Sequence, residues 1–154
     1  MIHVALYQPE IPPNTGNVIR LCANTGAQLH LIHPLGFQMD DKALRRAGLD
    51  YHEFAQVREH ESLGALHAAL PKSRLLPVST RGQHRHDQVE FETDDVLLFG
   101  PETRGLPQAV LESVPPEHAI RLPMRPGNRS LNLSVAVAVV VYEPWRQMDF
   151  EGGS

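Results

Sequence analysis

Cysteine and lysine are almost absent from this sequence: Cys22 is the one cysteine, and Lys42 and Lys72 are the two lysines. A single cysteine excludes an internal disulfide and is typical of a reducing compartment, so we expect a cytoplasmic protein. The longest apolar run, residues 135–141, is far shorter than the roughly 20 residues that span a bilayer. Residues 1–4 lack the basic and apolar segments of a signal peptide. We therefore expect a soluble protein with no membrane partner.

Length and composition indicate one globular domain. The chain has 154 residues, of which 42% are hydrophobic and 21% charged, and this suffices for a single substantial core. We assign residues 1–150 to this domain and expect residues 151–154 to form a disordered tail. The net charge of −4 argues against a protein that coats nucleic acid.

The basic residues are nearly all arginine, whose planar fork matches the geometry of a phosphate better than lysine does. Five of them form two clusters: Arg45, Arg46, Arg121, Arg125 and Arg129. Pro123 and Pro126 disfavour a helix in the second cluster, which we therefore place on a loop. Solvated surface charge is the alternative for any single arginine, whereas the clusters favour phosphate contacts.

Strand and helix patterns alternate along the chain. The expected strands are residues 3–7, 29–32, 75–78, 96–99 and 120–122. The expected helices are residues 40–48, residues 62–70, and a segment launched by the turn at residues 12–16 that ends at Gly26, with Asn14 or Thr15 as N-cap. This order predicts an α/β fold with a mostly parallel sheet flanked by helices.

The segment before the carboxyl terminus carries conflicting signals. Residues 135–141 are rich in β-branched valine, which favours a strand, but the apolar stretch of residues 131–143 exceeds most strands in length. Ser130, Asn132 or Ser134 could cap a helix there, and Pro144 would end it. We favour a buried helix. Because it is apolar on most faces, it also suggests a subunit interface.

The loop after the strand at residues 96–99 is the most informative stretch. Residues 100–105 have the G-x-x-x-x-G spacing of a phosphate loop, yet Leu106 and Pro107 stand where Lys and Ser or Thr are required. Pro101 removes a backbone donor, and Glu102 would repel a phosphate. The loop therefore favours a neutral or positively charged ligand at the edge of the sheet.

Three segments, residues 14–20, 98–106 and 129–134, together resemble the three motifs of the SPOUT RNA 2′-O-ribose methyltransferases. The resemblance extends over nearly the whole chain and includes residues 9–13 and 45–51. It is closest to the small members that methylate the wobble nucleotide, cytidine or uridine, of tRNA anticodon loops. It implies S-adenosylmethionine as methyl donor, a tRNA anticodon stem-loop as partner, a homodimer and a carboxyl-terminal trefoil knot. Methylation of another RNA position, or RNA binding without catalysis, stays open.

The resemblance also implies roles for particular residues. The donor would be held by Val78, Gly100, Leu122, Met124, Ser130 and Leu131. The catalytic residues would be Arg20, Glu102, Ser130 and Asn132, and the five clustered arginines would bind RNA. For the apolar donor-site residues, ordinary core packing is the alternative.

Each implied catalytic role has a structural alternative. Arg20 would activate the 2′-hydroxyl together with an RNA phosphate, although a guanidinium keeps its proton and is a poor base alone. Its alternative is an ion pair with Glu102 or Glu10. Glu102 would position Arg20 or the donor, or else be a turn carboxylate bound by backbone donors. Asn132 would hold the ribose or fix the loop, or else cap a helix.

The nine histidines lack the spacing and partner cysteines of a zinc site, so we expect no metal. Cys22 lies on the apolar face of an expected helix and is assigned to the core. Tyr142 and Trp145 could stack on a base or contact a second subunit.

Overall fold

The computed structural model describes residues 1–40, 42–46, 49–128 and 130–154, so predictions for Arg129 and for part of residues 40–48 lie outside it. In the described residues, the strands form one sheet in the order β3-β2-β1-β6-β4-β7-β5, and every pair is parallel. The strands are β1 (His3–Tyr7), β2 (Gln28–Ile32), β3 (Arg58–His60), β4 (Leu75–Val78), β5 (His84–Arg85), β6 (Val96–Phe99) and β7 (Ile120–Arg121). The predicted α/β fold with a parallel sheet is confirmed.

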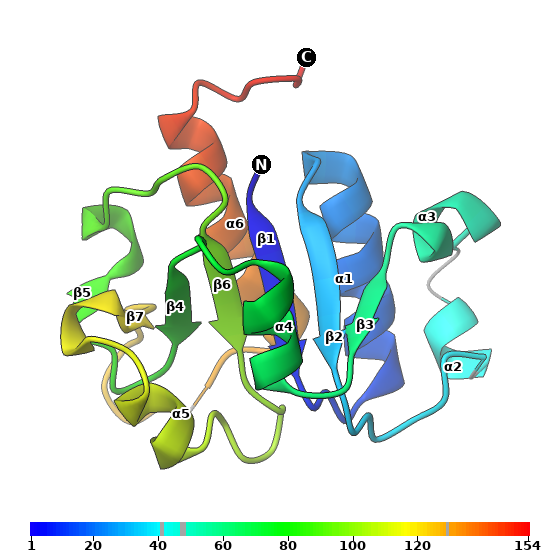
Figure 1. Ribbon diagram of the computed structural model, residues 1–154, viewed down its shortest axis with the longest axis horizontal. Coiled ribbons are helices and arrows are strands. Elements are labelled where there is room, and N and C mark those ends of the chain that lie inside the picture. The colour runs from blue at the N-terminus through cyan, green and yellow to red at the C-terminus, as the bar shows by residue number, and fades with distance from the viewer. Residues whose placement is uncertain (41, 47–48, 129) are drawn as a thin grey trace.

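Helices cover both faces of this sheet (Figure 1). The helices are α1 (Pro12–Thr25), α2 (Lys42–Arg45), α3 (Tyr51–Ala55), α4 (Leu63–Ala69), α5 (Gln108–Glu112) and α6 (Leu133–Gln147), with short 3-10 turns η1 (His86–Gln88) and η2 (Pro116–His118). Helices α1 and α6 pack behind the sheet in this view, α4 and α5 lie in front, and α2 and α3 flank α1 at one end.

The alternation of side chains along the strands divides the core between the two faces. Val4 and Leu6 of β1 pack towards α1 and α6, whereas Ala5 between them packs towards α4. Cys22 is buried on the inner face of α1, and burial raises the pKa of its thiol to about 12. The assignment of Cys22 to the core is therefore confirmed. Among the described residues, no helix is long and apolar enough to cross a membrane.

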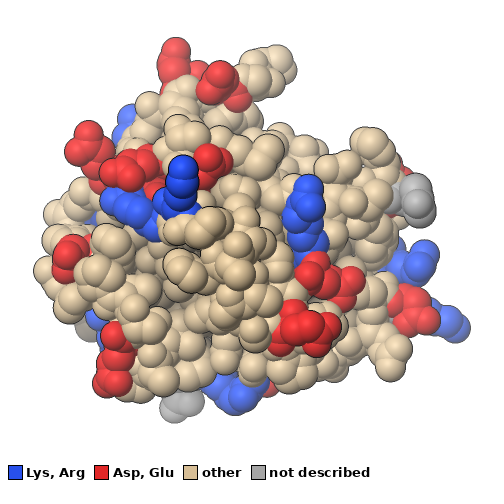
Figure 2. Space-filling model, in the orientation of Figure 1, with Lys and Arg blue, Asp and Glu red and all other residues tan. Residues whose placement is uncertain are grey.

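Charged side chains of both signs are interspersed on the face shown in Figure 2. Basic side chains project at the edge of the molecule formed by α2 and α3, which lies at one end of the sheet in Figure 1. This edge includes the predicted arginine pair, since α2 ends at Arg45 and Arg46 follows it; both are exposed.

The boundaries of α1 correct one prediction. The N-cap is Ile11, and Asn14 and Thr15 lie buried inside the first turn. The helix begins earlier than expected because Pro12 and Pro13 suit its first positions, where a backbone N–H has no intrahelical partner. Its end is as predicted: Gly26 has a φ of 79°, and its N–H donates to the carbonyl of Cys22 at 3.0 Å.

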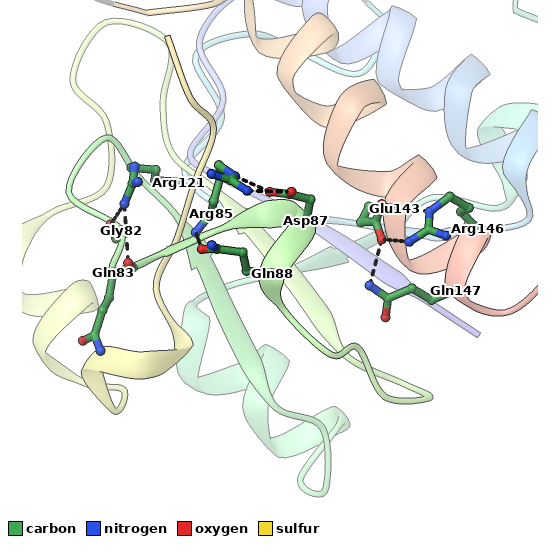
Figure 3. A network of polar contacts seen from close by, with 9 residues as sticks. All are labelled: Gly82, Gln83, Arg85, Asp87, Gln88, Arg121, Glu143, Arg146 and Gln147. Carbon is green, nitrogen blue, oxygen red and sulfur yellow. Dashed lines mark hydrogen bonds and ion pairs between the residues drawn. The ribbon is translucent and has the colours of Figure 1, made fainter.

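Helix α6 is confirmed as a helix, but Pro144 does not end it, and the helix continues to Gln147. Pro144 is buried, so its packing offsets the missing hydrogen bond. The last turn is also tied together by side chains: Glu143 accepts hydrogen bonds from Arg146 and Gln147 at 2.8 Å each (Figure 3). Gln147 further donates to the carbonyl of Val89 at 2.9 Å, which anchors the turn to the segment beneath it.

Candidate functional site

The carboxyl ends of β4, β6 and β7 meet at one edge of the sheet. Val78 at the end of β4 lies in register with Phe99 of β6 and with Ile120 of β7. Gly100 follows Phe99 directly, and Leu122 comes two residues after Ile120. Three predicted donor-binding residues, from segments far apart in sequence, are therefore brought to the edge where parallel sheets bind ligands.

Two glycines allow backbone segments to pack against each other at this edge. A Cβ on Gly100 would lie 2.6 Å from the carbonyl carbon of Gly105 and would also collide with the backbone nitrogen of Leu106. A Cβ on Gly82 would collide with the backbone of Ile120. Any side chain at these positions would therefore force the loops apart.

The segment after β7 supplies the other predicted donor-binding residues. Leu131 is 43% exposed and Ser130 is exposed, whereas Met124 and Leu122 are partly buried. Leu122 packs partly against the main core cluster, so core packing describes part of its role. Leu131 is too exposed for core packing to account for it, so its role in donor binding stays a prediction.

Glu102 binds the amino-terminal end of α1. Its carboxylate accepts hydrogen bonds from the backbone N–H of Glu10 at 2.8 Å and of Ile11 at 2.7 Å, and from the Asn14 amide at 3.3 Å. Ile11 has no capping side chain, so Glu102 supplies the negative charge that the positive end of the helix favours. For Glu102, the structure therefore matches the alternative of a turn carboxylate bound by backbone donors, and these donors belong to the beginning of α1.

Glu10 makes the reciprocal contact with the loop that carries Glu102. Its carboxylate accepts from the backbone N–H of Thr103 at 2.9 Å and from the Thr103 hydroxyl at 2.7 Å, and it lies 3.4 Å from Nε of Arg104. These contacts, the Thr103 N–H first, hold the pKa of Glu10 below its usual value. The carboxylates of Glu10 and Glu102 thus hold the loop after β6 against the segment that leads into α1. We call this pair of contacts the clasp.

Asn132 connects the third motif segment to the other two. Its Oδ1 accepts from the backbone N–H of Ser134 at 2.9 Å and from that of Val135 at 3.4 Å, which makes Asn132 the N-cap of α6. Its Nδ2 donates to Oδ1 of Asn14 at 3.0 Å. The amide therefore both caps a helix and extends the polar chain from Glu102 through Asn14.

Asn14 was missed as a site residue by sequence reasoning, which assigned it a possible capping role. It lies inside the first of the three motif segments and is only 8% exposed. A buried amide requires hydrogen-bond partners, and its two partners come from the other two segments. The position of Asn14 within the first motif segment was the feature of the sequence that could have indicated a role at the site.

Arg20 faces a different direction. Its Nε donates to Oε2 of Glu53 in α3 at 2.7 Å. The alternative given for Arg20, an ion pair on its helix, is therefore present, but the carboxylate is that of Glu53 and not the suggested Glu102 or Glu10. Arg20 lies six residues after Asn14 in α1, which separates the two by about 9 Å along the axis and about 120° around it.

The five predicted RNA-binding arginines lie in different environments. Arg45 and Arg46 are exposed at the α2 edge, and the Arg45 guanidinium lies 5.4 Å from the centre of the Phe54 ring. Arg121 donates to the carbonyls of Gly82 and Gln83 at 3.4 Å each (Figure 3).

The remaining two belong to the segment after β7. Arg125 is exposed, and Arg129 lies outside the described residues. Arg121 and Arg45 therefore each have a structural contact beside the predicted role, and Arg45, Arg46 and Arg125 are exposed.

Three histidines form a hydrogen-bonded chain across β1, β2 and β3. Nδ1 of His3 lies 2.9 Å from Nε2 of His30, and Nδ1 of His30 lies 2.8 Å from Nε2 of His60. Burial, followed by the neighbouring histidines and Arg58, lowers the pKa of His30 to about 3. In the described part of the chain, no group of three or more His, Cys, Asp or Glu side chains is arranged to hold a metal ion.

The sheet is parallel, and at its carboxyl edge two glycines let the loops pack closely beside a chain of polar side chains. This is the arrangement, and the edge, at which α/β proteins bind ligands. The chain belongs to the SpoU rRNA methylase family, whose model matches residues 1–142. The family expected from the three motif segments is confirmed.

Relatives of high identity match over the full length. The tRNA (cytidine(34)-2′-O)-methyltransferase of Methylovorus glucosotrophus (strain SIP3-4) is 58% identical over 152 residues, which cover 99% of each chain. A protein of the same name from Burkholderia pseudomallei (strain 1106a) is 60% identical over 156 residues and covers 100% of both chains. The one from Escherichia coli (strain K12) is 56% identical over 152 residues, 99% of this chain and 97% of its own.

Solved structures share the fold. A structure that gives insights into the 2-OH methylation of C/U34 on tRNA is 48% identical, with a TM-score of 0.89 over 97% of each chain. A putative RNA methyltransferase from Bacillus anthracis is 42% identical, with a TM-score of 0.90 over 100% of this chain and 98% of the other. The SpoU methyltransferase AviRb from Streptomyces viridochromogenes, in complex with AdoMet, is 23% identical, with a TM-score of 0.82 over 99% of this chain and 58% of the other.

Proposed function

We propose that this chain transfers a methyl group from S-adenosylmethionine to the ribose 2′-hydroxyl of nucleotide 34, a cytidine or uridine, in tRNA anticodon loops. The observation that carries the proposal is the polar chain from Glu102 through Asn14 to Asn132, which joins the three motif segments beside the carboxyl edge of the sheet. The names of the relatives that are 56–60% identical over nearly the whole chain support the same activity.

The residues at the edge fit a positively charged methyl donor. The loop after β6 carries the carboxylate of Glu102 and has no lysine, and its one cation, Arg104, lies beside Glu10. At Gly100 the missing Cβ lets the backbone turn back on itself. We assign the donor site to Val78, Gly100, Leu122, Met124, Ser130 and Leu131, within the trefoil knot of the family. S-adenosylmethionine supplies the methyl group there, and AviRb has been solved with this donor bound.

The reaction forms a bond between the 2′-oxygen and the methyl carbon while the bond from that carbon to sulfur breaks. The donor leaves as the neutral thioether S-adenosylhomocysteine, and the hydroxyl proton passes to solvent. Arg20 keeps its proton, so we assign it to orienting an RNA phosphate and stabilising negative charge on the 2′-oxygen. Glu102 fixes the donor loop against α1. Asn132 and Ser130 hold the ribose and the donor at the beginning of α6.

We also propose a homodimer. Beside its buried face, α6 carries a second apolar stripe with four- and three-residue spacing: Val135 is 48%, Val139 43% and Tyr142 45% exposed. Burying this stripe would stabilise an assembly, and a second copy of α6 is the partner we assign. Within one chain, Arg20 points about 120° away from Asn14, which belongs to the polar chain at the proposed site. We therefore propose that Arg20 of each subunit acts at the methyl-transfer site of the other subunit.

The RNA partner is the tRNA anticodon stem-loop, bound by Arg45, Arg46, Arg121, Arg125 and Arg129 through its phosphates. We propose that residues 1–150 act as a single domain and that the protein works in the cytoplasm, where its tRNA substrate is found.

The test is incubation of the protein with labelled S-adenosylmethionine and bulk tRNA from a strain that lacks this methylation. We expect label in the tRNA. Folded protein that binds the donor and the tRNA yet transfers no label would instead indicate an RNA-binding protein without catalysis.

A further inference from the structure

The ion pair between Arg20 and Glu53 has a geometry that fixes an arginine rather than merely neutralising it. The contact is made by Nε, at 2.7 Å from Oε2 of Glu53. Because Nε lies in the plane of the guanidinium, a bond at this atom restricts the rotation of the whole planar group. The Arg20 side chain is still 42% exposed, so RNA can reach it from solvent.

Glu53 is itself held firmly in α3. Its backbone N–H donates to Oδ1 of Asp50 at 2.8 Å, and its Oε1 accepts from the backbone N–H of Asp50 at 3.5 Å. This reciprocal capping box fixes the first turn of α3 and the carboxylate that projects from it. The Glu53 side chain is only 14% exposed, which favours a single orientation.

The Arg20–Glu53 pair also joins α1 to α3 at a place where these two helices are not closely packed. A cavity of about 270 Å³ lies between α1 and α3, and Ile19, His52 and Glu53 are among the residues that line it. Arg20 and Glu53 therefore contribute a direct polar link across this part of the interface between the helices.

Helix α3 lies beside the surface assigned to RNA. The Arg45 guanidinium of α2 is stacked over Phe54, the residue that follows Glu53. Figure 1 shows α2 and α3 together at the end of the molecule beside α1. Two of the five proposed RNA-binding arginines, Arg45 and Arg46, are thus close in sequence to the carboxylate that holds Arg20.

We infer that Glu53 is a positioning residue for methyl transfer: it holds the Arg20 guanidinium in the orientation that the 2′-hydroxyl and its phosphate require. The inference rests on the proposed function of Arg20. It adds α3, which lies outside the three motif segments, to the active site.

The test compares kcat and KM for tRNA in Glu53→Ala, Glu53→Gln and Arg20→Ala, with donor affinity measured by calorimetry. Glu53→Ala should lower kcat by about 10- to 100-fold, because a misplaced catalytic group costs rates of this order, and leave donor affinity within about twofold. Glu53→Gln keeps an oxygen that accepts from Nε, so it should restore kcat to within about threefold of the wild type. Where Glu53→Ala fails to fold, Glu53→Asp, whose carboxylate is too short to reach Arg20, should show the same loss of kcat.

Two controls separate positioning from stability. Asp50→Ala removes the side-chain cap of α3 but keeps the backbone N–H that donates to the Glu53 carboxylate and the Glu53–Arg20 contact itself. It should therefore lower the melting temperature without lowering kcat. Glu59→Gln removes a carboxylate of β3 that pairs with His33 at 2.8 Å, and it should leave kcat unchanged. A kcat for Asp50→Ala as low as that of Glu53→Ala would overturn the inference, because the loss would then come from the helix.

The double variant Arg20→Ala, Glu53→Ala decides whether the two residues act as a unit. We expect its kcat to equal that of Arg20→Ala, because Glu53 has nothing left to position. A further loss equal to that of Glu53→Ala alone would refute positioning. An inactive Arg20→Ala beside a fully active Glu53→Ala would overturn this inference alone, whereas a fully active Arg20→Ala would overturn the proposed role of Arg20.

Discussion

Glu10 and Glu102 each bind the loop that carries the other. The Glu102 carboxylate accepts from the backbone N–H of Glu10 at 2.8 Å, and the Glu10 carboxylate accepts from the N–H of Thr103, the residue after Glu102, at 2.9 Å. The two residues lie 92 positions apart in sequence. Their exchange fixes the loop after β6 to the beginning of α1, and we expect the proposed donor site to depend on both.

Glu102→Ala should weaken both the fold and donor binding. It leaves the backbone N–H groups of Glu10 and Ile11 without their acceptor, which we expect to cost about 2 kcal/mol of unfolding free energy. The released loop should lower donor affinity by about tenfold or more. Urea unfolding and calorimetry measure the two effects. Glu112→Ala, which changes an exposed carboxylate of α5, is the matched control, and equal losses in both variants would contradict the clasp.

Asn132 offers a way to separate helix capping from the link to Asn14. Asn132→Asp keeps an oxygen that can accept from Ser134 and Val135 but loses the Nδ2 donor to Asn14. We expect a turnover reduced by about tenfold or more, and an unfolding free energy lowered by about 1 kcal/mol because the buried Asn14 oxygen loses its donor. Asn132→Ala removes both contacts and should cost about 1 kcal/mol more, for the lost helix cap. Wild-type turnover in Asn132→Asp would show that capping is the whole role of this residue.

The buried histidine chain predicts a loss of stability in mild acid. The pKa of His30 falls from 6.5 to about 3 on folding, chiefly through burial, and the pKa values of His3 and His60 are lowered too. Below about pH 6.5 the unfolded chain binds protons that the folded chain does not, so the free energy of unfolding should decrease down to about pH 3. The charged groups beside the chain are Asp94 and the amino terminus near His3, and Arg58.

Urea unfolding between about pH 7.5 and about pH 5 measures this slope. His30→Gln should be less stable near neutrality but should lose less stability on acidification. His67→Gln, an exposed residue of α4, should keep the wild-type slope. An unchanged slope in His30→Gln would refute the assignment.

The exposed stripe of α6 predicts that one charge should dissociate the dimer. Val139→Glu places a carboxylate at a residue that is 43% exposed in the single chain and covered in the proposed assembly. Light scattering should give the mass of one chain instead of two, with activity lost because each site lacks the partner's Arg20. Ala109→Glu, exposed on α5 across the sheet, should leave the mass unchanged. A fully active monomer would contradict the shared site.

The sequence predicts the elements in which composition and burial agree. The strands β1, β4 and β6 are at their expected positions, because short apolar runs bounded by turn residues suit the centre of a parallel sheet. Helix α6 was identified by its length despite its valines, since burial on the sheet outweighs the low helix propensity of valine. By contrast, β3 is Arg58–His60, an edge strand with no apolar residue, and it was not expected.

One missed element had a readable signal. Asp50 and Glu53 stand three residues apart in the pattern of a capping box, which marks the beginning of α3. The contacts of the site are harder to predict, because they depend on the order of the strands rather than on local sequence. Asn14 and Glu102 are 88 residues apart, and Asn14 and Asn132 are 118 apart. The motifs identify the participants, but the fold decides that Arg20 meets Glu53 instead of Glu102.

The most direct test of the central claim is to map the methylated nucleotide by mass spectrometry. Unmodified tRNA would be treated with the protein and S-adenosylmethionine, digested with nuclease and sequenced, with Arg20→Ala as the inactive reference. We expect a single added methyl group on the ribose of nucleotide 34, present with the wild type and absent with the variant. A methyl group on a base, or on the ribose of another nucleotide, would contradict the account.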